Sequence, residues 1–251
     1  MKYVSAFLMA VSTYTILPVP AKCWRDESYP IMVVFLPFAG LVIGAIWYAL
    51  ATLLGAVHMP ALITAAVFTL CPHALSGFFH LDGFMDVSDA VMSRRELSER
   101  QRILKDSHVG AFAVIMAASL FLILFALWGS LPEGADLRAL ILAPVCSRCV
   151  TGLSVTVLRS MSTSQYSGVY KKDMKKGCAI ALAAELLIAL IVSAILGVRC
   201  LIPAAAAALF AALSVAVNTR SLGGMSGDIA GRALTVGEAF AAAAIVAVSF
   251  L

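Results

Sequence analysis

Three carboxylates stand at helical spacing directly after a long apolar segment. Asp82, Asp86 and Asp89 lie in the stretch HLDGFMDVSD, at relative positions i, i+4 and i+7. On an α-helix this spacing places all three side chains on one face, with about 5–6 Å between neighbouring Cβ atoms. No Lys or Arg follows before Arg94 to relieve their repulsion. Because oxygen ligands suit Mg²⁺ or Mn²⁺, Asp82, Asp86 and Asp89 are predicted to hold a divalent cation. The alternative is a solvated acidic helix end without metal.

Two neighbours of these acids are candidates for the same site. His80 could act as a general base, a ligand or a hydrogen-bonding residue near the membrane interface. Because residues i and i+2 of a helix do not share a face, we do not expect His80 to pair directly with Asp82. Gly83 permits a bend or a close approach of the backbone to a ligand. Carboxylates at a membrane boundary are costly and usually functional, so metal or phosphate chemistry is favoured, with His80 and Asp82 as catalytic candidates.

A second candidate segment is KDSHVG, residues 105–110. Asp106 or Ser107 is suited to cap the helix that begins near Gly110. A functional interpretation competes with simple capping, because free N–H groups at a helix start, together with Lys105, can hold a phosphate. We therefore treat Lys105, Ser107 and Gly110 as candidate substrate-binding residues.

A third candidate segment is SLGGMSGDIAGR, residues 221–232. It combines a Gly-rich turn with one acid, and such turns expose backbone donors to anions. Gly227, Asp228 and Gly231 are the candidate substrate-binding residues. One Gly-rich loop is weak support, but the three segments are expected to converge on one membrane face.

The elements that position these segments are predicted to be membrane helices. The chain has 251 residues, of which 62% are hydrophobic and 13% charged, whereas a soluble domain carries roughly a quarter charged residues. We expect an all-α polytopic membrane helix bundle, with residues 1–251 forming a single integral-membrane domain. About 20 apolar residues cross a bilayer. The qualifying segments are 31–54, 61–81, 109–130, 138–158, 177–197, 200–218 and 234–251. Residues 3–17 are too short to span and are predicted to form an interfacial or re-entrant helix.

Charge distribution predicts the orientation. In a model with seven spans, the loops 18–30, 82–108, 159–176 and 219–233 lie on one side and hold 14 of the 18 basic residues. The remaining four are Lys2, Arg138, Arg148 and Arg199. The positive-inside rule places the basic loops in the cytoplasm. The three candidate segments are therefore expected to face the cytoplasm from the cell membrane.

Polar residues within the predicted spans raise further questions. Arg148 lies inside a span and needs a partner or a wet cavity, for which Glu185 and Glu238 are the candidates. Cys146 and Cys149 form a C-x-x-C, which we interpret as ordinary helix packing because no further zinc ligands stand at matching spacing. The basic segment 159–176 either clamps an anionic substrate or sets the topology beside anionic lipid.

Four blocks resemble one known family. HLDGFMDVSDA, RILKDSHVGAFAV, SGDIAG near the C-terminus and ILPVP near the N-terminus are similar in order and spacing to the cobalamin synthases, or adenosylcobinamide-GDP ribazoletransferases. The resemblance implies a Mg²⁺-dependent membrane transferase. It would join adenosylcobinamide-GDP to α-ribazole or its 5′-phosphate, giving adenosylcobalamin or its 5′-phosphate and GMP.

The roles of individual residues are our own hypothesis from these motifs and not a property of the family. Asp82, Asp86 and Asp89 would hold Mg²⁺ on the pyrophosphate, and Asp106 and Asp228 are candidates for further ligands or for the base that accepts the hydroxyl proton. One departure concerns the N-terminal block, which in the family usually reads T-R-L-P-V-P. Here Ile16 replaces the Arg, so that either Arg25 substitutes for it or it is dispensable.

Partners and rival functions complete the expectations. The expected partners are the two substrates and the lipid bilayer, with no nucleic acid; a homo-oligomer, or association with other corrinoid-assembly enzymes, is left open. The first rival is a CDP-alcohol phosphotransferase, but Asp82-Gly83 is not followed by that family's Ala-Arg, and its later Asp pair is missing. The second is a transporter, which should carry its acids near mid-membrane rather than at one edge.

Overall fold

The computed structural model describes residues 2–20, 24–161 and 172–251, and the side chains of residues 172–175 lie outside this description. The described parts are almost entirely helical, and an isolated bridge between Ser160 and Met225 is their only β-type pairing. The elements are α1 (Lys2–Tyr14), the 3₁₀ helix η2 (Asp26–Phe35), α2 (Leu36–Ala56), α3 (Ala61–Leu75), α4 (Phe79–Met92), α5 (Leu97–Ile103), α6 (Ala111–Gly129), α7 (Ala139–Val157), α8 (Lys172–Leu196), α9 (Val198–Leu222) and α10 (Gly227–Ser249).

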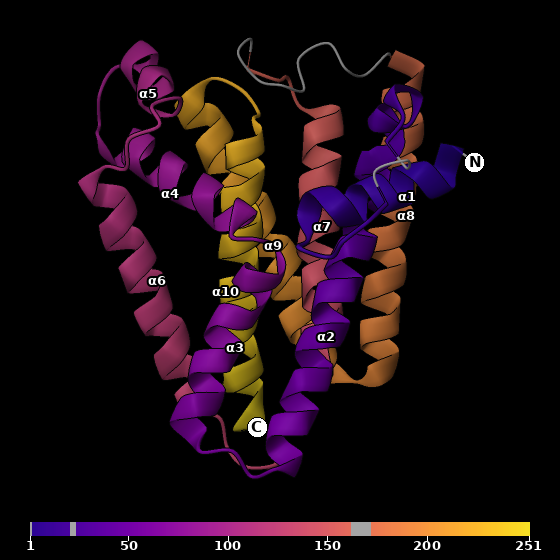
Figure 1. The fold of residues 1–251 in the computed structure, drawn as a ribbon, viewed down its shortest axis with the longest axis vertical. Helices are drawn as coiled ribbons and strands as arrows, with labels where there is room; N and C mark the ends of the chain where they lie inside the picture. Colours follow the sequence, from indigo (N-terminus) through magenta and orange to yellow (C-terminus); the bar gives the residue numbers. More distant parts are fainter. Residues whose placement is uncertain (1, 21–23, 162–171) are drawn as a thin grey trace.

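The described helices confirm a polytopic membrane bundle. Six of them are long and apolar enough to cross a bilayer: η2 continued by α2, α6, α7, α8, α9 and α10. The pair α3 and α4 passes the same test together but is bent by 92°. In Figure 1, α3 begins at the end of the bundle where α2 finishes, and α6 begins near the opposite end, after α5. The bent pair therefore acts as one broken span, which brings the crossings to seven.

The prediction of one continuous span over residues 61–81 is wrong. Helix α3 stops at Leu75, and the chain turns through Gly77 and Phe78, whose φ angles are +61° and +60°. The N–H of Phe78 donates to the carbonyl of His73 at 2.7 Å. Two successive left-handed residues cannot continue a right-handed helix, and hydropathy alone carries no signal for such a turn.

Helix α1 is the short N-terminal helix predicted over residues 3–17. It runs across the upper half of the bundle in Figure 1, at a steep angle to the spanning helices. Its Met9, Ala10 and Tyr14 pack against η2 and the start of α2. The segment that follows α1 is tied to the break in α3, because the N–H of Ile16 donates to the carbonyl of Leu75 at 2.9 Å.

Helices α7 and α10 form the interior of the bundle. The most apolar 18-residue stretch of α7 is 72% buried and that of α10 is 56% buried, whereas the corresponding stretches of α6 and α8 are each only 17% buried. The two outer helices therefore turn most of their apolar surface toward the surroundings, as expected where lipid is the solvent. Glycines bring the inner helices together: a Cβ on Gly44 of α2 would lie 2.6 Å from the carbonyl oxygen of Leu140 in α7. Small residues at such contacts are typical of membrane helix packing.

The contact between α2 and α7 predicts a specific sensitivity. In Gly44→Val the new side chain would overlap the α7 backbone, and overpacking costs roughly 1–3 kcal/mol. For a chain of this size we expect the melting temperature in detergent to fall by roughly 2–10 °C. Gly55→Val, which adds the same residue to the same helix where no atom lies within 4 Å, is the control. Equal melting temperatures for both variants would contradict the packing described.

Candidate active site

Helices α4 and α10 meet backbone to backbone at two glycines. A Cβ on Gly83 of α4 would lie 2.7 Å from the carbonyl oxygen of Asp228 in α10. A Cβ on Gly231 would lie 3.0 Å from the carbonyl oxygen of His80. No side chain fits between the helices here, so the contact places the first turn of α10 directly beside the acidic part of α4.

The predicted stripe of acids on α4 is confirmed as a stripe. Asp82 is exposed and Asp86 and Asp89 are partly exposed, whereas most of the residues between them are buried. Asp228 joins the stripe from α10, since Asp86 lies within electrostatic range of Asp82, Asp228 and Asp89. Within the described residues none of these four carboxylates forms an ion pair.

The side chains in this arrangement do not form a closed metal cage. Across the described parts of the chain, no group of three or more His, Cys, Asp or Glu side chains is arranged to hold a metal ion. The fold brings Asp82, Asp86 and Asp228 to one place, but it does not arrange them as a finished coordination sphere.

Arg232 fixes the crossing of the two helices from the α10 side. Its Nη1 donates to the hydroxyl oxygen of Ser88 at 2.6 Å and to the carbonyl oxygen of Phe84 at 3.3 Å. Its guanidinium also lies 5.1 Å from the centre of the Phe84 ring. From the sequence, Arg232 is recognised only as one of the basic residues of the predicted loop 219–233. The sequence does place Arg232 on the same face of α10 as the candidate residue Asp228, because the two are four residues apart.

The carboxylate of Asp89 caps the start of α6. Its Oδ2 accepts the N–H of Gly110 at 2.7 Å, and its Oδ1 accepts the N–H of Ala113 at 2.9 Å. The residue at the N-cap position is Gly110, which makes no side-chain cap. The prediction that Asp106 or Ser107 caps this helix is therefore wrong, because a carboxylate from another helix satisfies these free N–H groups.

The hydrogen bond from the N–H of Gly110 to Asp89 holds the segment 105–110 beside the acids. Asp106 accepts two hydrogen bonds within its own loop, from Nδ1 of His108 at 2.7 Å and from the backbone N–H of the same residue at 3.0 Å. These bonds, with Arg102 nearby, hold the pKa of Asp106 below its usual range. Lys105 and Ser107 are exposed and are free to meet a ligand from solvent.

The third segment forms the turn into α10. Gly223 adopts φ +80°, and the N–H of Met225 donates to the carbonyl oxygen of Arg159 at 2.9 Å. Ser226 caps the helix by accepting the N–H of Ile229 at 3.3 Å. Gly227 and Asp228 follow in the first turn, where the helix dipole favours negative charge.

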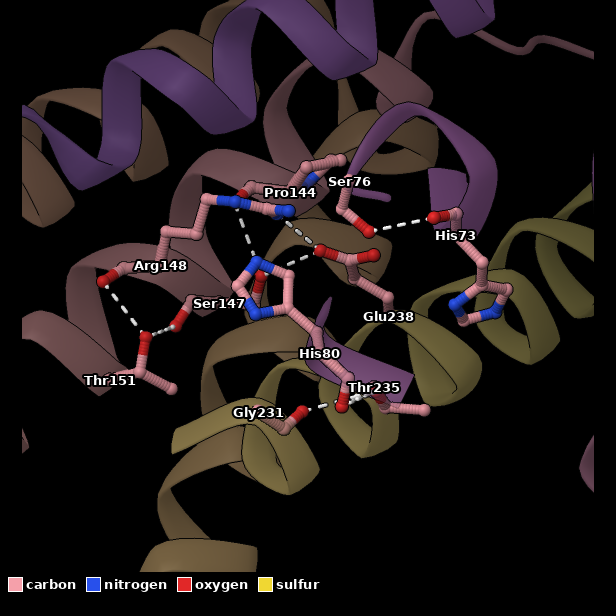
Figure 2. A network of polar contacts seen from close by, with 10 residues as sticks. All are labelled: His73, Ser76, His80, Pro144, Ser147, Arg148, Thr151, Gly231, Thr235 and Glu238. Carbon is pink, nitrogen blue, oxygen red and sulfur yellow. Dashed lines mark hydrogen bonds and ion pairs between the residues drawn. The ribbon is translucent and has the colours of Figure 1, made fainter. Parts of the chain in front are cut away.

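A buried polar network joins residues of α4, α7 and α10 (Figure 2). Arg148 of α7 forms an ion pair with Glu238 of α10, and their side chains are only 1% and 11% exposed. This identifies Glu238 rather than Glu185 as the partner of Arg148. His80 belongs to this network and not to the acidic stripe: it is buried, and its ring stacks on Tyr14 at 6.1 Å between centroids. Its carbonyl oxygen accepts the Thr235 hydroxyl at 3.3 Å.

The remaining sequence expectations have simple outcomes. Cys146 and Cys149 are buried and free, in agreement with helix packing. Arg25, the candidate substitute for the missing family Arg, lies 3.8 Å from Glu27 in an exposed ion pair. Most of the basic segment 159–176 lies outside the described residues, so its predicted clamp stays a prediction. The catalytic role of His80 and the metal role of Asp89 also stay predictions.

Fold and site together define a multi-pass membrane protein with a polar site between two helices at one end of its bundle. Comparison with known proteins identifies the family. The family model for cobalamin-5-phosphate synthase matches residues 6–246, and the chain belongs to that family.

Named relatives agree with this match over nearly their whole length. An adenosylcobinamide-GDP ribazoletransferase from Clostridium perfringens is 37% identical over 238 residues, covering 94% of this chain and 95% of the relative. A protein of the same name from Clostridium botulinum is 32% identical, covering 92% of each chain. One from Lachnoclostridium phytofermentans is 29% identical, covering 98% of this chain and 95% of the relative. No solved structure matches the chain.

The cap made by Asp89 predicts an order of stabilities. Asp89→Ala removes both acceptors at the start of α6 and should cost about 0.5–2 kcal/mol, as for other lost caps. Asp89→Asn keeps one acceptor and should unfold at a temperature between the alanine variant and the wild type. Thermal unfolding in detergent micelles measures this order. If all three proteins melted at the same temperature, Asp89 would have no capping role.

Proposed function

We propose that the chain joins adenosylcobinamide-GDP to α-ribazole or to α-ribazole 5′-phosphate, giving adenosylcobalamin or its 5′-phosphate and GMP. The family match over residues 6–246 supports this reaction, as do the names of relatives aligned over more than nine-tenths of their length. The observation that carries the site is the contact of Gly83 with Asp228, because it joins acids from two separate motifs. The same match does not favour a CDP-alcohol phosphotransferase or a transporter.

We propose Mg²⁺ as the cofactor, held by Asp82, Asp86 and Asp228. These donors are carboxylates only, the ligand type that Mg²⁺ prefers, and no described cation neutralises them. Both oxygens of Asp89 already accept backbone N–H groups, which favours Asp228 over Asp89 as the third ligand. When bound, the ion would neutralise the charge of the pyrophosphate during transfer.

The reaction that we propose is a displacement at phosphorus. A ribose hydroxyl of α-ribazole loses its proton to water and forms a new P–O bond to the phosphorus on the corrinoid side. The bond from that phosphorus to the bridging oxygen breaks, and GMP leaves with this oxygen. In phosphoryl transfer the protein mainly positions groups and neutralises charge. The lowered pKa of Asp106 makes this carboxylate a weak acceptor for the hydroxyl proton, so we assign Asp106 to loop structure instead.

We propose that phosphate oxygens meet the site from its exposed side. Lys105 and Ser107 are accessible there, and the first turn of α10 offers the backbone N–H group of Gly227. The other candidate glycines have packing roles, since Gly83 and Gly231 form the helix contact and Gly110 lies against the Asp89 carboxylate. These three are needed for the shape of the site rather than for contact with substrate.

We also propose that the site faces the cytoplasm. Two of the predicted basic loops can be followed in the described residues: α5 and the turn into α10 lie at the same end of the bundle (Figure 1). The connections after α2 and α6 lie at the opposite end. With the positive-inside rule, this distribution supports a cytoplasmic acidic site.

Activity in liposomes tests the function and the site. Purified protein given adenosylcobinamide-GDP, α-ribazole and Mg²⁺ should release GMP. Asp82→Asn should lower turnover by about 100-fold or more, at the upper end of the losses seen when groups supporting a metal are removed. Asp26→Asn, an exposed acid outside the site, is the control. Full turnover in Asp82→Asn would remove the site assignment, and release from a CDP-activated alcohol would favour the rival enzyme.

Cysteine labelling tests the orientation. In a Cys23→Ser background the cysteines at positions 71, 146, 149, 178 and 200 are buried and unpaired. Ser98→Cys in α5 should react with a membrane-impermeant maleimide only in inverted vesicles. Glu133→Cys, in the connection between α6 and α7, should react from outside intact cells. The reverse pattern would place the acidic site outside the cytoplasm.

A further inference from the structure

The interior of the bundle is built around one buried cation. Arg148 is 1% exposed, and a Cβ on Gly40 of α2 would lie 2.6 Å from its Cδ. Its Nη1 donates to the carbonyl oxygen of Pro144 at 3.1 Å and to Oε1 of Glu238. Ser147 adds a hydroxyl bond to the same carboxylate oxygen at 3.3 Å. A charge buried in the membrane is costly unless it is paired, so this pair fixes the rotation of α10 against α7.

His80 connects this pair to the acidic helix. It lies two residues before Asp82, and its ring lies beside the Arg148–Glu238 pair (Figure 2), within electrostatic range of Arg148. Its Nε2 is buried and has no hydrogen-bond partner among the described residues, and the same is true of Nε of Arg148. The first can accept a hydrogen bond and the second can donate one. A buried polar atom left without a partner is destabilising.

The same two helices carry the acids of the site. Glu238 lies on α10 ten residues after Asp228, and His80 begins the helix that carries Asp82 and Asp86. The carbonyl oxygen of His80 accepts the Thr235 hydroxyl of α10 at 3.3 Å. A rotation of either helix would therefore disturb the buried network and the acidic site together.

We propose that His80, Arg148 and Glu238 are positioning residues that align α4 with α10 for catalysis. His80 presents a buried acceptor atom beside the Arg148–Glu238 pair and holds the start of α4 in place; it is not the group that takes the proton from substrate. This inference rests on the proposed metal site, because Asp82, Asp86 and Asp228 are the groups that the alignment would position. It adds three residues, from three helices, to the requirements of the reaction.

Two substitutions of His80 separate this role from a catalytic one. His80→Gln keeps an acceptor in place, whereas His80→Leu keeps bulk and removes it. We expect His80→Leu to lower turnover in GMP release by about 10–100-fold, as when supporting groups around a metal are lost. His80→Gln should restore most of this loss. Equal losses in the two variants would overturn the positioning role and return His80 to the candidates for a base.

The ion pair is tested by removing both charges together. Glu238→Gln alone leaves a buried guanidinium without its partner and is expected to unfold, since breaking a buried ion pair leaves an uncompensated charge in the interior. The double variant Arg148→Gln/Glu238→Gln buries no charge and should fold, but it should show reduced turnover and a higher Mg²⁺ concentration at half-maximal rate. Glu185→Gln, a half-buried acid of α8 outside the network, is the matched control and should behave as wild type.

The readouts keep the two proposals distinguishable. Turnover and its rescue by His80→Gln are measured whether or not Mg²⁺ is the cofactor, so a wild type that needs no Mg²⁺ would overturn the metal proposal alone. A folded double variant, confirmed by its melting transition in detergent, with wild-type turnover would overturn the inferred role of Arg148 and Glu238. Loss of activity in Glu185→Gln equal to that in the double variant would overturn it too, because any intramembrane acid would then have the same effect.

Discussion

The close contact between α4 and α10 is the constraint on which the rest of the structure depends. Two helices that each carry carboxylates repel each other, and here they touch through their backbones at Gly83 and Gly231. The contact holds because other bonds oppose the repulsion. Arg232 bonds Ser88 and the Phe84 carbonyl oxygen across the crossing. The molecule thus concentrates negative charge at one helix contact and holds the two helices together there with the hydrogen bonds of Arg232.

The membrane explains why these opposing bonds are buried. In lipid, helices gain little from apolar contact with each other, so small residues and polar bonds have to hold them together. The chain uses both: glycines join α2 to α7, and an ion pair joins α7 to α10. The outer helices α6 and α8 contribute mainly apolar surface. Polar specificity is therefore concentrated along the inner helices, which lead directly to the acids.

Much of the fold could be predicted from the sequence, because hydropathy and charge report directly on the bilayer. The crossings, the short α1 and the acid stripe on one face all follow from such patterns. The break at Gly77 and Phe78 could not be predicted, since its cause is a local backbone conformation that hydropathy does not record. Partners far apart in sequence were also missed: Asp89 with the start of α6, and Arg232 with Ser88. Spacing within a helix shows which residues share a face, but only the packed bundle shows which other helix that face meets.

The hydrogen bond that Asp89 accepts from the N–H of Gly110 makes two sequence motifs a single structural unit. A Cβ at position 110 would lie 2.5 Å from Oδ1 of Asp89, so the carboxylate fits only where the other chain position has no side chain. Neither residue can change alone without leaving a clash or unsatisfied N–H groups. Related chains should therefore keep or replace the two positions together, and a chimera that exchanges one of the two motifs between distant relatives would have to carry the other with it.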